Sequence, residues 1–126
     1  MLRVCRGGAA VALDCYPCEC DETELAKLVE EIRAKGGVIE RYAADVSDKE
    51  AVNDMVQAII KRFGRADMLV NNAVTGVLSP FTELSFETFM HMMKVNCGGA
   101  FLMRNECIPQ VLEQGSGSIV MVSFSL

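Results

Sequence analysis

Polar side chains with the chemistry to bind a nucleotide follow three separate apolar segments of the sequence. Asp14 comes just after the first segment, Asp45 just after the second, and Asn71-Asn72 just after the third. In nucleotide-binding folds, a carboxylate at the end of a strand accepts hydrogen bonds from ribose hydroxyl groups. A single aspartate in such a place is typical of a helix cap or a turn. Three polar strand ends in this spacing favour one shared crevice.

Thiols form a second group with chemical potential. The segment C-Y-P-C-E-C contains Cys15, Cys18 and Cys20, whereas the only histidine, His91, lies far away in the sequence. Because zinc needs four ligands and no secretory segment suggests a disulfide framework, we predict no metal site and ordinary reduced thiols. A thiol or metal module on these cysteines is the less favoured alternative.

Short apolar runs alternate with amphipathic stretches along the whole chain. The capping-box patterns Asp21 to Glu24 and Ser47 to Glu50 each predict the start of a helix, and Gly36-Gly37 predicts the end of the first one. Ser85 is expected to cap a long helix that runs to Glu113. We predict strands near Ala10–Leu13, Val38–Ala43, Met68–Val70 and Ile119–Val122.

This order of elements predicts the fold class. Continuous apolar strands separated by crossover helices are typical of a parallel sheet with helices on both faces. We therefore predict one α/β domain over residues 1–126, a doubly wound parallel sheet in a three-layer α/β/α arrangement. The strand ends that carry Asp14, Asp45 and Asn71 would then meet at one edge of the sheet.

The charge balance limits the partners. Acidic residues outnumber basic residues by 17 to 12, which gives a net charge of −5. This excess argues against binding to nucleic acid or to an anionic membrane surface, since both are negatively charged. No apolar run approaches the roughly 20 residues that span a bilayer, and no signal peptide is visible. We expect a cytoplasmic protein without nucleic-acid or membrane partners.

From about Arg6 to Val122 the sequence resembles the short-chain dehydrogenase/reductase family, whose cofactor domain is Rossmann-like. Five segments in the family's order and spacing carry this resemblance. They are A-V-A-L-D at 10–14, A-A-D-V-S-D at 43–48, F-G-R-A-D-M-L-V-N-N-A at 63–73, K-V-N-C-G-G-A-F-L at 94–102 and G-S-G-S-I-V-M-V-S at 115–123.

The resemblance implies roles for the strand-end residues. Asp14 matches the acidic residue that holds the adenosine ribose, which implies NAD in preference to NADP, because a carboxylate there repels a 2′-phosphate. Asp45 matches the residue that contacts the adenine amino group, and Val46 lies beside the ring. Asn72 and Ala73 match the segment that passes under the cofactor ribose.

The resemblance also implies a reaction, in which hydride moves between the nicotinamide and a small-molecule alcohol or ketone. Asn96 matches the active-site asparagine of the family. The family's serine, however, falls at Phe124, the glycine after N-N-A is Val74, and neither T-G-x-x-x-G-x-G nor Y-x-x-x-K is present. These departures predict a truncated, inactive form whose own binding of NAD is weak.

The missing phosphate-binding motif has a consequence for the fold. In the family's strand order, the strand before that motif lies between the strands that end at Asp14 and Asn71. The first central strand of the sheet is therefore expected to be missing. The alternative function is a non-catalytic interaction module that pairs with a full-length relative through the helix from Phe86 to Glu113. The chain is also expected to form homo-oligomers through this helix.

Overall fold

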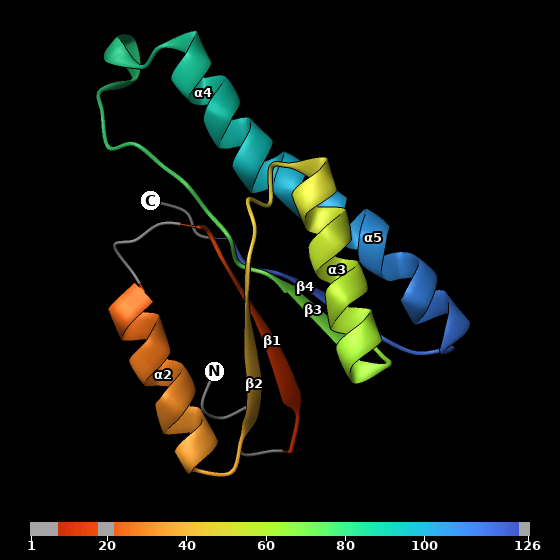
Figure 1. Cartoon of the computed structure of the whole chain (residues 1–126). Coiled ribbons are helices and arrows are strands. Elements are labelled where there is room, and N and C mark those ends of the chain that lie inside the picture. The colour runs from red at the N-terminus through yellow and green to blue at the C-terminus, as the bar shows by residue number, and fades with distance from the viewer. Residues whose placement is uncertain (1–7, 18–21, 124–126) are drawn as a thin grey trace. The chain divides into compact units, whose positions relative to one another are not determined.

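The computed structural model describes residues 8–17 and 22–123 (Figure 1). The chain divides into two compact units, residues 1–45 and residues 46–126. Each unit contains one two-stranded parallel sheet among its described residues, so the four predicted strands form two pairs.

The first unit pairs strand β1 (Ala10–Cys15) with strand β2 (Val38–Ala43) and connects them through helix α2 (Glu22–Ala34). The register runs from Ala10 opposite Val38 to Cys15 opposite Ala43. Helix α2 covers one face of this sheet, where its apolar side chains surround a buried strand residue. The cluster consists of Val29, Ile32 and Ile39, with Val11, Leu13 and Leu28 packed against it.

The end of α2 follows the predicted glycine signal. Gly36 adopts a φ of 80°, a left-handed conformation that a side chain disfavours. The N–H of Gly37 donates to the carbonyl of Ile32 over 3.0 Å. The helix therefore ends in a C-terminal turn that leads directly into β2.

The second unit pairs β3 (Met68–Asn71) with β4 (Ser118–Met121). Helices α3 (Lys49–Phe63) and α5 (Ala100–Glu113) pack on this sheet around Val52, Val56 and Cys107 (Figure 1). Leu69 of β3 contacts the same cluster. A side-chain amide of α3 also donates to a carboxylate of α5, from Asn53 Nδ2 to Glu106 Oε2 over 2.9 Å.

The predicted long helix is confirmed, with one local change. Ser85 caps it, since its Oγ accepts from the N–H of Thr88 over 3.1 Å. A short 3-10 turn, η2 (Phe81–Glu83), precedes the helical run. The run itself consists of α4 (Phe86–Met93), a π-helical segment η3 (Lys94–Gly99) and α5. Gly98 and Gly99, which have a low helix propensity, lie within the widened π turn.

The cap of α3 and the bounds of β1, β3 and β4 differ from the predictions. The cap of α3 is Asp48, whose Oδ1 accepts from the N–H groups of Glu50 and Ala51 at 2.9 and 3.1 Å. Ser47 was the expected cap, but it is buried. An ionised carboxylate one residue later bonds two free N–H groups and also complements the helix dipole. Strand β1 also extends beyond Leu13 to include Asp14. Strand β3 also includes Asn71, and β4 begins and ends one residue earlier than predicted.

Several residues named in the sequence analysis cannot be placed in the fold. Asp21, Cys18, Cys20 and Phe124 lie outside the described residues. Within residues 8–17 and 22–123, no helix has the length and apolar character to cross a bilayer. The same residues contain no group of three metal-binding side chains close enough to share an ion.

Candidate functional site

Asp14 lies near the carboxyl end of β1, opposite Tyr42 of β2. Because side chains alternate along a strand, Asp14 is on the other face from Leu13, which packs against α2. The Oδ1 atom of Asp14 is buried and has no hydrogen-bond partner among the described residues. A buried acceptor without a donor is unusual in a folded protein and favours a ligand that donates to it.

The environment of Asp14 disfavours its charged form. Burial, with a smaller contribution from the negative charge of Asp45, raises the pKa of this carboxyl from 3.8 to about 6. The backbone N–H groups of Ala44 and Cys15 oppose this shift and lower the pKa. Asp14 and Asp45 are therefore close enough to interact electrostatically, as expected for two acidic residues at neighbouring strand ends.

The neighbouring thiol of Cys15 lies on the opposite face of the sheet. Its Sγ accepts from Arg41 Nε over 3.0 Å and donates to the carbonyl of Tyr42 over 3.4 Å. Among the described residues, Cys15 therefore bonds one side chain and one backbone carbonyl of β2.

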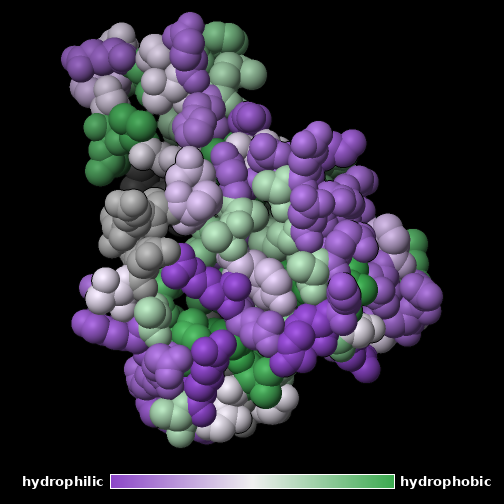
Figure 2. All heavy atoms as spheres, in the orientation of Figure 1, coloured by the Kyte–Doolittle hydropathy of each residue, from purple (hydrophilic) through white to green (hydrophobic). Residues whose placement is uncertain are grey.

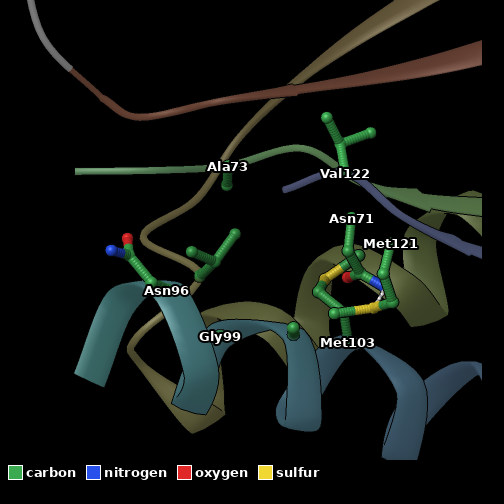
Figure 3. Close-up of a pocket in the computed structure, with 9 residues that line it drawn as sticks. Asn71, Ala73, Asn96, Gly99, Met103, Met121 and Val122 are labelled. Atoms are coloured by element: carbon green, nitrogen blue, oxygen red, sulfur yellow. Dashed lines mark hydrogen bonds between the residues drawn. The ribbon is translucent and has the colours of Figure 1, made fainter. Parts of the chain in front are cut away.

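In the second unit, side chains from four segments border a small pocket of about 30 Å³ (Figure 3). Three residues of the sequence prediction line it, Val46, Ala73 and Asn96. The remaining lining residues are Asn71, Gly99, Ala100, Met103, Met121 and Val122. This volume accommodates a water molecule but not a nicotinamide or adenine ring.

Asn96 projects from the π-helical segment η3 and holds the chain that follows β3. Its Oδ1 accepts from the N–H of Thr75 over 2.8 Å, and its Nδ2 donates to the carbonyl of Thr75 over 2.9 Å. The asparagine side chain thus replaces a strand neighbour for one residue of an otherwise irregular segment.

The segment after β3 is open to solvent. Asn72 and Ala73 are exposed, and Val74, which occupies the family's glycine position, is 57% exposed. None of the described non-glycine residues adopts a positive φ, so Val74 fits an ordinary backbone conformation. Asn71 belongs to β3 itself, and its Nδ2 donates to Met121 Sδ over 3.3 Å (Figure 3).

The predicted site residues therefore fall into two groups. Asp14 and Asp45 come together in the first unit, whereas Val46, Ala73 and Asn96 line one pocket in the second. Asn72 lies next to Ala73 but is not among the lining residues. Residue types and spacing did not reveal Thr75 or Gly99, because Thr75 acts through its backbone and a glycine carries no functional group.

The residues around Asp14 fit the adenosine half of a dinucleotide. A ribose hydroxyl would supply the donor that the buried Oδ1 lacks among the described residues. The T-G-x-x-x-G-x-G motif does not occur in these 126 residues.

The sequence of the chain matches a known protein family. The short chain dehydrogenase family matches residues 2–125 of the chain. A tropinone reductase homologue of Arabidopsis thaliana is 35% identical over 109 residues, which cover 86% of this chain and 41% of the relative.

Solved structures of the same kind share the fold. A metagenomic short-chain oxidoreductase in complex with NADP matches with a TM-score of 0.88 and 26% identity, covering 99% of this chain and 55% of the other. An NAD⁺-bound xylitol dehydrogenase matches with a TM-score of 0.85 and 30% identity, covering 95% and 45% of the two chains. The chain therefore spans about half the length of the proteins that it matches, and it belongs to the short-chain dehydrogenase family.

Proposed function

We propose that these residues provide the adenosine-binding side and the active-site asparagine of an NAD(P)-dependent oxidoreductase. The substrate class is a small alcohol or ketone, as expected from the family. The observation that carries the proposal is the buried Oδ1 of Asp14, which lacks a donor among the described residues and lies at the end of a parallel strand. A ribose hydroxyl is the donor that such a site in this fold receives.

The preferred cofactor in this proposal is NAD. A 2′-phosphate carries about two negative charges and would place them near Asp14. Asp14 already lies close enough to Asp45 for their charges to interact. The ribose of NAD instead offers a hydroxyl in the same place. Both neutral and charged forms of Asp14 can accept a hydrogen bond from it.

The remaining residues orient the cofactor. Asp45 accepts from the adenine amino group, and Val46 provides an apolar contact beside the adenine. Asn72 and Ala73 pass under the ribose, and Asn96 holds this segment through the backbone of Thr75. When bound, NAD supplies the nicotinamide that accepts or donates hydride.

The 126 residues alone are proposed not to turn over substrate. The two tyrosines, Tyr16 and Tyr42, are followed four residues later by Cys20 and Val46 rather than by lysine. The family's proton relay therefore has only its asparagine here, and an amide does not act as a general acid or base near neutral pH.

The test compares two adenosine nucleotides on the chain as it exists. Chemical-shift titration with 5′-AMP and with adenosine 2′,5′-bisphosphate should give tighter binding of 5′-AMP. Asp14→Asn should reduce this difference several-fold, because the substitution removes the charge that repels the 2′-phosphate. Glu24→Gln on α2 removes one exposed negative charge from the same unit and should leave the difference unchanged. Equal binding of both nucleotides by the unsubstituted chain would contradict the NAD preference.

A second function, as a non-catalytic interaction module, is favoured by the surface of the helical run. Apolar side chains lie exposed along it, with Phe86 at 71%, Phe101 at 63% and Leu112 at 74%. Figure 2 shows hydrophobic side chains among polar ones over the segment that holds η2 and α4. Exposed aromatic residues at this density are typical of a surface that packs against another protein.

The partner in this second proposal is a full-length relative or another copy of the chain. Co-purification with a full-length relative at high salt, without added nucleotide, would support it. Phe101→Ser should weaken the association. Leu78→Ser should not, because Leu78, although 94% exposed, lies on the loop before the helical run and not on the helical surface itself. Equal weakening by both substitutions would point to nonspecific hydrophobic contact.

A further inference from the structure

Gly99 lies in direct contact with Val46, although 53 positions separate the two residues. A Cβ atom on Gly99 would lie 2.7 Å from Val46 Cγ2, 3.1 Å from Val46 Cβ and 3.3 Å from the carbonyl oxygen of Val46. Gly99 is buried and adopts a helical backbone conformation, with φ −57° and ψ −48°. The glycine is therefore required by the close approach of Val46 and not by its own backbone conformation.

Val46 has little freedom to move away from this contact. It is 8% exposed, and its β-branched side chain is restricted in χ1. A rotamer change would move Cγ2 but would leave Cβ and the carbonyl oxygen in place. A side chain at position 99 therefore has to displace the backbone of Val46 or the helical segment.

The adjacent Gly98 provides an internal comparison. A Cβ on Gly98 would meet only the carbonyl oxygen of Met93, at 3.9 Å, which is an ordinary contact distance. Both glycines belong to the same π-helical segment, η3. The requirement for a missing side chain is thus specific to the glycine that faces Val46.

The same segment carries Asn96, which bonds the backbone of Thr75. Asn96 and Gly99 lie on one helical segment beside the pocket (Figure 3). One turn of helix therefore fixes two chain segments, the one that follows β2 through Gly99 and the one that follows β3 through Asn96. Because Gly99 contacts Val46 directly, a side chain at position 99 would act on Val46 without an intermediate residue.

We propose that Gly99 is a positioning residue for nucleotide binding, whose missing side chain sets the place of Val46 beside the adenine ring. This inference rests on the function proposed above for Val46. Gly99 has no functional group of its own, but it would determine where the segment that contacts the adenine lies.

The test uses Gly99→Ala with Gly98→Ala as the matched control. Gly99→Ala should shift the methyl resonances of Val46 and weaken 5′-AMP binding by at least about fivefold, because overpacking moves Val46. Gly98→Ala adds the same methyl group one residue away. It should leave the Val46 methyl resonances in place and the 5′-AMP affinity within about twofold of that of the unsubstituted chain. A similar response to both substitutions would overturn the proposal, since it would indicate a general effect on the helix.

A double variant separates positioning from simple loss of folding. Val46→Ala removes Cγ2, which makes the shortest contact at 2.7 Å, but leaves the contacts with Cβ and the carbonyl oxygen at 3.1 and 3.3 Å. Gly99→Ala should therefore weaken 5′-AMP binding less, but still measurably, when combined with it. If Gly99→Ala prevents folding, the double variant should restore a folded chain, and failure to do so would overturn the proposal. If the unsubstituted chain binds no 5′-AMP, the proposed function fails and this inference with it. If that chain binds 5′-AMP and Gly99→Ala has no effect, only this inference fails.

Discussion

The side-chain amide of Asn96 bonds both backbone polar groups of Thr75, accepting from its N–H at 2.8 Å and donating to its carbonyl at 2.9 Å. Thr75 lies in an irregular segment after β3, where no strand partner satisfies its backbone. The asparagine therefore supplies the donor and the acceptor that a β-ladder would otherwise provide.

Removal of this amide should loosen the segment after β3. Asn96→Ala leaves one donor and one acceptor of Thr75 unpaired, which should lower the free energy of unfolding by about 1–3 kcal/mol in urea titration. Hydrogen exchange at the Thr75 amide should accelerate. Unchanged exchange at this amide would contradict the assigned role.

Asn96→Asp tests the same contact by charge. An ionised carboxylate still accepts from the Thr75 N–H, but its other oxygen faces the Thr75 carbonyl and cannot donate. We expect destabilisation at neutral pH that decreases at acidic pH, where the protonated acid donates again. A pH-independent effect would show that only shape matters at this position.

Asp14 should make folding stability depend on pH. Its pKa is raised from 3.8 to about 6, mainly by burial, so the folded chain binds the proton more tightly than the unfolded chain does. The contribution of Asp14 to stability is therefore fully present below about pH 4 and is lost as the pH rises through about 6.

The measurement compares Asp14→Asn with the unsubstituted chain. The variant cannot ionise, so at pH 7–8 it should be more stable by about 1 kcal/mol, a value that allows for solvent screening of a partly exposed group. Below about pH 4 this advantage should disappear. Urea unfolding at several pH values gives the difference between the two proteins, and a difference that does not vary with pH would rule out this titration.

Gly117 should tolerate no side chain, for a reason that is independent of the candidate site. A Cβ at this position would lie 2.7 Å from Val111 Cγ1 and 3.0 Å from Val111 Cγ2. Gly117→Ala should therefore destabilise the fold by about 1–3 kcal/mol through overpacking. Combination with Val111→Ala should recover part of the loss.

Gly76→Ala is the matched control for this prediction. In the part of the chain that the structure describes, no atom outside Gly76 and its two neighbours lies within 4 Å of a Cβ placed on Gly76, and the φ of Gly76 is not positive. Its free energy of unfolding should therefore change little. A comparable loss in both variants would indicate a general cost of replacing glycine instead of contact with Val111.

The secondary structure was largely predictable from the sequence because its signals are local. The apolar run A-V-A-L at residues 10–13 and the stripe within Lys49–Phe63 each determine one element. The cap of α3 was misplaced by one residue, since Ser47 and Asp48 are both good caps and only the folded backbone selects between them. Such ambiguity is typical of adjacent residues with similar hydrogen-bonding groups.

The candidate site was predictable only where side-chain chemistry marks it. Asp14 and Asn96 carry functional groups at recognisable positions, whereas Gly99 and Thr75 act through a missing side chain and through the backbone. The π-helical segment that places Asn96 and Gly99 also has no periodicity of its own in the sequence. These features depend on contacts between segments that are distant along the chain.

The 126-residue chain by itself should not catalyse hydride transfer. Correct positioning of two reacting groups lowers a reaction barrier by about 7–11 kcal/mol. The sequence contains no T-G-x-x-x-G-x-G motif, so these residues lack the family's pyrophosphate anchor for the cofactor. Most of the positioning of the nicotinamide should therefore be lost.

Proton transfer should fail for a separate reason. A positioned acid or base contributes about 10²–10⁴-fold to the rate, and no Tyr-x-x-x-Lys is present to provide it. Asn96 cannot replace this pair, because an amide neither gives nor takes a proton near neutral pH, and its two polar atoms already bond Thr75. We expect no change in NADH absorbance with a panel of alcohols and ketones. Turnover above the buffer blank that Asn96→Ala abolishes would show that the chain carries out the reaction with groups other than the family's relay.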